Sequence, residues 1–198
     1  MAYSQFTMAR LRKEYHLNVT TQEALFADAQ PAVISDLLRE TLLKRTGFAL
    51  RSGSEKARSA YIIAPIVTEA YEQMQDRVNL FSGVEFKVDE AQGMDGFCDF
   101  IYTLAPNTLE ILAPVISVVE AKKEDIPKGI PQCLAELVAA QIFNAAEERP
   151  IETLYGIVTN GVEWKFLSLR GTDVVIDADE YLLNQPEKIV GIILSMLR

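Results

Sequence analysis

The chain has 198 residues, of which 49% are hydrophobic and 24% are charged, a composition that is typical of a folded globular protein and excludes disordered and fibrous classes. One domain usually has about 100 to 200 residues, so we expect a single domain. The formal net charge of −9 excludes a protein that is basic throughout. Basic residues cluster only locally, at residues 10–13, 44–51 and 56–58, so any binding of nucleic acid should be weak and sensitive to salt.

No feature of the sequence indicates a membrane or secreted protein. The apolar runs at residues 61–67 and 189–194 are short compared with the roughly 20 residues of a spanning helix. The first 16 residues have no apolar segment with a small-residue cleavage site. Cys98 and Cys133 belong to no CxxC or Cys/His cluster, so we expect buried, reduced thiols. The sequence predicts a cytoplasmic protein without a membrane partner.

Residues 1–50 are predicted to form a helical extension that packs on the core. Within them, apolar residues at helical spacing predict a helix that begins at Pro31 and ends at Gly47. Ser54 is in position to cap a second helix that begins at Glu55. Pro65 should kink or divide this second helix.

Three strands are predicted in the middle of the chain. Residues 84–89 alternate apolar and polar side chains, and residues 97–103 form an apolar strand with Asp99 inside it. A buried carboxylate is costly unless a metal ion or a lysine compensates its charge. The third strand, within residues 114–124 (PVISVVEAKKE), is a buried run that ends in charged residues. Asp99 and the charged end of this strand are therefore the unusual features.

Side chains alternate between the two faces of a strand, so Glu120 and Lys122 should point to one face and Ala121 to the other. Taken alone, a carboxylate beside an ammonium is typical of an ion pair at the rim of a sheet. A functional role for the pair therefore depends on what surrounds it.

The rest of the chain predicts a helix, a hairpin and a final helix. Residues 131–148 form the first helix, with Gln132 in its first turn near the end of the preceding strand. Asn160 and Gly161 lie between two alternating segments and predict a hairpin with a type I′ turn. Residues 171–181 read as a loop, and Pro186 opens an amphipathic helix that either closes the core or forms an interface.

Four segments, in their order along the chain, resemble those of the PD-(D/E)XK nuclease superfamily, which has the restriction-endonuclease-like fold. These segments are GFCDFIY, VISVVEAKK, GIPQCLAELVAAQ and YGIVTNGVEWKFLSL. One departure is Cys98, which stands where the name-giving proline would be. The resemblance implies an α/β fold whose mixed central sheet of about five strands is flanked by helices. Residues 51–198 would form this nuclease-like domain, with residues 1–50 as an added N-terminal helical segment.

The resemblance also implies a metal site. Hydrolysis of a phosphodiester needs a hard cation held by carboxylate oxygens, which suits Mg²⁺ or Mn²⁺. Asp99 and Glu120 would be its ligands, joined by the backbone carbonyl of Ala121. An acid of the first helix of the nuclease-like domain often joins such a site; Glu55 is the first choice and Glu69 the rival.

The implied catalytic residues are Asp99, Glu120, Lys122 and Gln132. Lys122 would position or help to deprotonate the attacking water and stabilise charge on the phosphate, and Gln132 would orient water or a phosphate. His16 is the only histidine, which excludes a Ser-His-Asp or Cys-His mechanism unless that residue serves. The sequence therefore predicts a metal-dependent DNA nuclease, acting alone or as a homodimer. The alternatives are a nuclease-fold accessory protein that acts through a partner protein, and an unrelated α/β domain.

Overall fold

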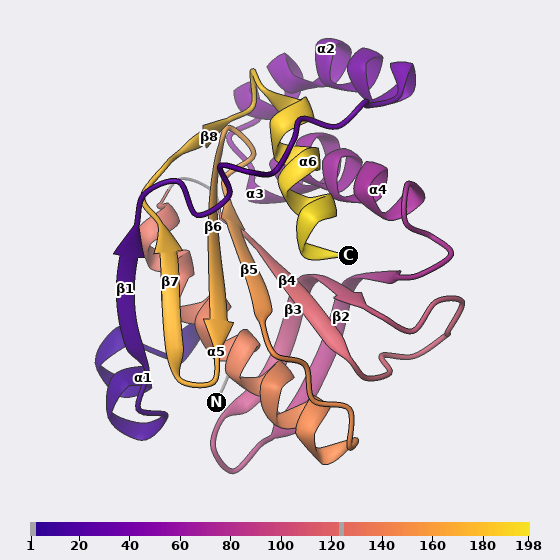
Figure 1. Cartoon of the computed structure of the whole chain (residues 1–198). Coiled ribbons are helices and arrows are strands. Elements are labelled where there is room, and N and C mark those ends of the chain that lie inside the picture. The colour runs from indigo at the N-terminus through magenta and orange to yellow at the C-terminus, as the bar shows by residue number, and fades with distance from the viewer. Residues whose placement is uncertain (1–2, 123–124) are drawn as a thin grey trace.

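The computed structural model describes residues 3–122 and 125–198, so Lys123 and Glu124 of the predicted charged strand end lie outside the described residues. The protein is an α/β structure in which helices flank one mixed, open sheet (Figure 1). The strands are β1 (Asn18–Gln22), β2 (Asn79–Asp89), β3 (Met94–Thr103), β4 (Val115–Ala121), β5 (Leu154–Thr159), β6 (Glu163–Arg170), β7 (Asp173–Asp177) and β8 (Tyr181–Leu182).

Among the described residues the sheet has eight strands rather than the predicted five. Its order is β1-β7-β6-β5-β4-β3-β2, with β8 paired to β6. The β4–β5 and β1–β7 pairs are parallel, and the other pairs are antiparallel. The predicted five correspond to β2 to β6. The other three are short, and β1 is largely exposed, so they lack the apolar alternation that identifies a strand from sequence.

Helices cover both faces of the sheet. They are η1 (Tyr3–Gln5), α1 (Met8–Glu14), α2 (Asp36–Arg51), α3 (Glu55–Arg58), the π-helical turn η2 (Ser59–Ile63), α4 (Ala64–Glu72), α5 (Ile126–Ala146) and α6 (Pro186–Met196). The elements α2, α4 and α6 share one apolar core with the sheet, and η1, α1 and α5 share a second core. Figure 1 shows α2, α4 and α6 grouped together, away from α1 and α5.

The strand β4 lies between these two cores, and all of its residues are buried. Val118 belongs to the core on the α5 side, whereas Val119 and Ala121 belong to the other core. A strand covered on both faces is expected to be apolar along its whole length. Glu120 and Lys122 therefore lie at the end of a central strand and not of an edge strand.

The N-terminal segment is not purely helical, which corrects the prediction for residues 1–50. β1 lies within it and pairs in parallel with β7, far away in the sequence. The predicted helix start at Pro31 is wrong, because Ala32 N–H donates to the carbonyl of Glu187 (2.8 Å) and keeps this stretch extended against α6. α2 begins after Ser35, whose hydroxyl accepts from the N–H of Leu38 (3.1 Å).

The predicted stop at Gly47 is also wrong, since α2 continues to Arg51. A glycine inside a helix costs only about 1 kcal/mol relative to alanine. The helix continues past it and buries Ala49 against the core.

The helix after Ser54 is divided near Pro65, as predicted. The side chain of Ser54 accepts from the N–H of Ala57 and begins α3. The π-helical turn η2 then precedes α4, and the N–H of Ala64 reaches back to the carbonyl of Ser59. Proline has no N–H to donate to the preceding turn, so the regular hydrogen-bond ladder is interrupted at this position.

The hairpin and the final helix are confirmed. β5 and β6 pair antiparallel around Asn160 and Gly161, and Gly161 has a positive φ of 85°. The predicted type I′ turn is wrong, because such a turn needs a positive φ at both central residues and Asn160 does not have one. Thr159 pairs with Trp164, so the connection is longer than a two-residue turn. The predicted loop at residues 171–181 is wrong, since it contains β7 and the start of β8. α5 begins at Ile126, earlier than predicted, because Asp125 caps it by accepting from the N–H of Lys128.

α6 contributes Ile189, Ile192, Ile193 and other apolar side chains to the core, which settles the open alternative in favour of closing it. Cys98 and Cys133 are buried free thiols, as predicted. Within residues 3–122 and 125–198, no helix is long and apolar enough to cross a membrane.

Candidate metal and catalytic site

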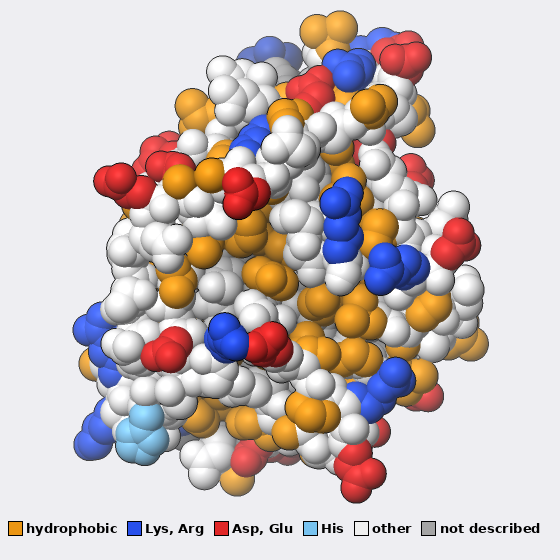
Figure 2. All heavy atoms as spheres, in the orientation of Figure 1, with side chains coloured by type: hydrophobic (Ala, Val, Ile, Leu, Met, Phe, Trp, Pro, Cys, Tyr) orange, Lys and Arg blue, Asp and Glu red, His pale blue; other side chains and the backbone are white. Residues whose placement is uncertain are grey.

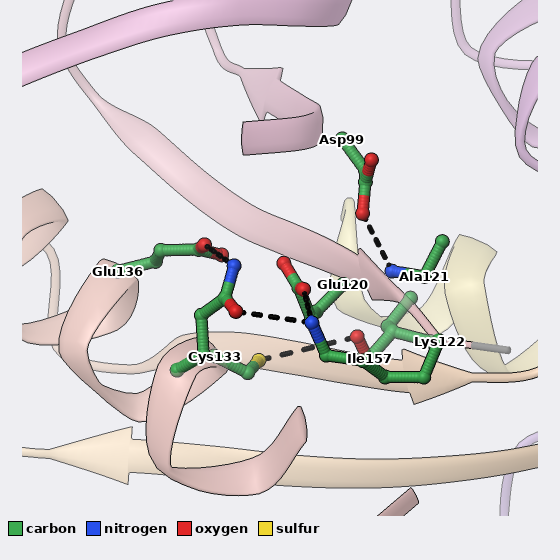
Figure 3. Close-up of polar contacts among 8 residues, drawn as sticks. Asp99, Glu120, Ala121, Lys122, Cys133, Glu136 and Ile157 are labelled. Carbon is green, nitrogen blue, oxygen red and sulfur yellow. Dashed lines mark hydrogen bonds and ion pairs between the residues drawn. The ribbon is translucent and has the colours of Figure 1, made fainter. Parts of the chain in front are cut away.

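The site begins where β3 and β4 separate. The paired register between these strands ends at Phe100 and Val119. The N–H of Lys122 donates to the carbonyl of Thr159 on β5 (2.8 Å), so the preceding N–H, of Ala121, points towards β3. There it meets the carboxylate oxygen Oδ2 of Asp99 at 2.8 Å instead of a backbone carbonyl (Figure 3). The side chain of Asp99 is thus fixed at the opening between the two strands.

Glu120 and Lys122 meet on the α5 side of the sheet, while Ala121 is buried in the opposite core. The Nζ atom of Lys122 is in contact with Oε1 of Glu120. Figure 3 shows these two side chains turned towards each other, with Asp99 apart from them at the backbone of Ala121. The side chain of Glu120 is only 3% exposed and that of Lys122 is 22% exposed, so the pair is not an ordinary rim ion pair.

Gly129 lets α5 approach the end of β4 closely. A Cβ atom at this position would lie 2.5 Å from Cγ1 of Val158 and 3.0 Å from Cγ of Lys122. Any larger residue would push α5 away from the sheet. This close approach allows Oε1 of Gln132, one turn further along α5, to accept a hydrogen bond from Nζ of Lys122 (3.0 Å).

Glu136 also belongs to the site, although no role was predicted for it from the sequence. Nε2 of Gln132 donates to Oε1 of Glu136 (3.1 Å). In addition to burial, the charge of the Glu120 carboxylate acts on Glu136 and raises the pKa of its carboxyl group. The available signal was the spacing of four residues from Gln132, which places both side chains on one stripe of an apolar helix.

Burial dominates the electrostatics of these acids. It raises the pKa of Glu120 to about 7; Lys122 partly counteracts this rise and Asp99 adds to it. Burial, followed by the charge of Glu120, raises the pKa of Glu136 well above its usual range. Burial also raises the pKa of Asp99, although the N–H of Ala121 opposes the rise. Burial lowers the pKa of Lys122, but the Glu120 carboxylate together with Glu55 and Asp99 outweighs it, so the net shift is upward and the ammonium stays charged.

The structure separates the two candidate acids of the first helix. Glu55, on α3, is exposed and acts electrostatically on both Asp99 and Lys122. Glu69 is buried and accepts from the N–H of Ser35 (2.9 Å), from its hydroxyl (2.6 Å) and from Nε2 of Gln73 (2.9 Å). Its carboxylate is therefore committed to the start of α2, and Glu55 is the acid that lies near the site.

The donor set suits a magnesium-like cation better than zinc. In the described part of the chain, no three His, Cys, Asp or Glu side chains are arranged as a metal cluster. Mg²⁺, however, is usually bound by one or two carboxylates, with water and substrate phosphate completing its shell. Asp99 and Glu120 supply two carboxylates. Oε2 of Glu120 is buried, and no N–H or hydroxyl donor within residues 3–122 and 125–198 reaches it.

No protein-family model and no curated protein matches the sequence of this chain. What can be inferred about function therefore comes from the arrangement of Asp99, Glu120, Lys122 and Gln132.

Proposed function

We propose that this protein is a metal-dependent nuclease that hydrolyses phosphodiester bonds in DNA, and that β2 to β6 with α5 form a restriction-endonuclease-like core. The observation that supports this most is the position of Lys122. Its ammonium is held between Glu120 and Gln132, at the end of a buried central strand. Asp99 lies where the neighbouring strand separates from it.

In this proposal the carboxylates of Asp99 and Glu120 hold Mg²⁺ or Mn²⁺. The backbone carbonyl of Ala121 and the nearby carboxylate of Glu55 are candidates for further ligands of the cation. When bound, such a cation polarises the phosphate and lowers the pKa of a water ligand. Lys122 supplies a positive charge to the phosphate as negative charge develops on it. The raised pKa of Lys122 favours this electrostatic role over that of a base, because the ammonium does not readily release its proton.

The surface beside the site offers contacts for a phosphate backbone. Arg58, on α3, donates to the carbonyl of Asn160 (3.1 Å), next to Thr159, which accepts from the N–H of Lys122. This bond ties α3 to the turn between β5 and β6, next to the end of β4. Lys56 on α3 and Arg51 at the end of the neighbouring α2 are exposed. Basic side chains at this place are what an otherwise acidic protein needs to bind DNA locally.

A cleavage assay tests the proposal. DNA is incubated with the protein in Mg²⁺, in Mn²⁺ and in excess chelator. We expect cleavage only with metal, and a rate lower by about a hundredfold or more in Lys122→Ala, since loss of one group that stabilises the transition state has an effect of this size. Lys87→Ala, an exposed lysine on β2, is the matched control. Absence of metal-dependent cleavage, or full cleavage by Lys122→Ala, would contradict the proposal.

The second candidate is an accessory protein that keeps the fold and acts through a partner. Two observations favour it: the net charge of −9 and the face in Figure 2, on which charges of both signs are scattered without a continuous basic stripe. It predicts neither cleavage nor a metal-dependent rise in melting temperature. A melting temperature that rises when Mg²⁺ is added to the wild type, but not when it is added to Asp99→Asn, would count against this candidate.

A further inference from the structure

Glu136 is a buried carboxyl group that the proposed reaction does not use directly. It is fully buried in the middle of α5, and its immediate neighbours Leu134, Ala135, Leu137 and Val138 are buried apolar residues. An apolar side chain of similar volume would usually be as stable or more stable at such a position. The carboxyl group is therefore better explained by its contacts than by packing.

Those contacts form a short chain that leads to Lys122. Oε1 of Glu136 accepts from Nε2 of Gln132 at 3.1 Å, and Oε1 of Gln132 accepts from Nζ of Lys122 at 3.0 Å. The same ammonium contacts Oε1 of Glu120. Glu136 is thus joined to the Lys122 ammonium through the amide of Gln132.

The chemistry of a glutamine amide gives this chain a direction. One end of the amide can only donate hydrogen bonds, and the other end can only accept them. Because Glu136 takes the donor end of Gln132, the acceptor end faces Lys122. If the amide were reversed, its NH₂ group would face the ammonium, and Lys122 would lose an acceptor.

We propose that Glu136 is a positioning residue, which fixes the amide of Gln132 so that its oxygen holds the ammonium of Lys122 beside Glu120. The consequence for catalysis rests on the proposed nuclease function. The orientation of Gln132 is a property of the folded chain and can be measured without any substrate.

Side-chain amide resonances of Gln132 test the orientation in metal-free protein labelled with ¹⁵N. They are assigned as the pair of signals missing from Gln132→Leu. In Glu136→Leu we expect this pair to shift towards the position of solvent-exposed amides, whereas in Glu136→Gln, which keeps an acceptor, it stays near its original position. The amide of Gln141, which donates to the carbonyl of Gly171 at the far side of α5, is the internal control.

Unchanged Gln132 resonances in folded Glu136→Leu would overturn the proposal, whether or not the protein cleaves DNA. If that variant does not fold, Glu136→Met serves instead, because methionine fits irregular spaces in a core.

Cleavage kinetics test the consequence. Removing a group that orients a functional side chain typically lowers activity by about 10- to 100-fold, so we expect a loss of this size in kcat for Glu136→Leu, with KM little changed. Glu136→Gln should recover a large part of the loss. The double variant Glu136→Leu/Gln132→Leu should be no slower than Gln132→Leu alone, since residues that act as a unit are not additive.

Losses that multiply in the double variant, or equal losses in Glu136→Leu and Glu136→Gln, would overturn the positioning role. A wild-type protein that cleaves nothing would refute the nuclease proposal, while the Gln132 resonances would still decide the role of Glu136.

Discussion

Replacing Glu120 by glutamine should change how the stability of the protein depends on pH. Glu120 is 2% exposed, and its ionised form is disfavoured by burial. Glutamine has nearly the same shape but does not ionise. A comparison of the two proteins without metal therefore isolates the free energy of placing this charge in the site.

The magnitude follows from the pKa of Glu120, which rises from 4.5 when unfolded to about 7 in the fold. At about 1.4 kcal/mol per pKa unit, the full penalty is about 3 kcal/mol. Below pH 4.5 both states are protonated and there is no penalty. Between pH 4.5 and 7 the unfolded state releases its proton first, so the stability of the wild type falls as pH rises; above pH 7 the loss is complete.

The assay is denaturant unfolding of wild type and Glu120→Gln in excess chelator at pH 5 and pH 8. We expect the stability advantage of Glu120→Gln over wild type to grow by about 2 to 3 kcal/mol between these pH values. Glu23→Gln, at an exposed position, controls for the change in net charge. A difference between wild type and Glu120→Gln that is the same at both pH values would refute the reasoning. Part of the penalty would be relieved by a cation bound to Glu120.

Three further changes test the surroundings of the site. The Cβ added by Gly129→Ala would lie 2.5 Å from Cγ1 of Val158, so this change should lower the free energy of unfolding by about 1 to 3 kcal/mol. It should also slow cleavage, because it displaces Lys122. Unaltered cleavage by the folded variant would contradict this prediction. Lys56→Ala should weaken DNA binding for every sequence tested and reduce the slope of log affinity against log salt by about 1, as measured by fluorescence anisotropy; an unchanged slope would remove Lys56 from the interface. Glu69→Ala should lower the free energy of unfolding by about 1 to 3 kcal/mol, because it leaves the N–H of Ser35 without its acceptor, and calorimetry should find the Mg²⁺ affinity unchanged. A weakened Mg²⁺ affinity would instead make Glu69 a ligand.

Local patterns in the sequence identified the centre of the fold. The strands β2 to β6 were predictable because each buries an apolar face or an entire apolar run, and the hairpin was marked by Asn160 and Gly161. The alternation of side chains along β4 was enough to place Glu120 and Lys122 on one face. These features depend on residues close together in the chain, which is why periodicity reveals them.

The tertiary structure decided the features that depend on distant partners. β1 is a polar strand that exists because β7, more than a hundred residues later, pairs with it, and the extended stretch before α2 is held by the carbonyl of Glu187. Neither contact leaves a periodic signal in the sequence.

The site shows the same division. The sequence by itself determined which charged residues end the central strand. Only the fold decided that Asp99 binds the N–H of Ala121, that Glu69 is committed to Ser35, and that Gln132 accepts from Lys122. The physical reason is that hydrogen bonds and the pKa values of buried acids depend on which groups meet in space, and the spacing of residues along one strand or helix does not specify that.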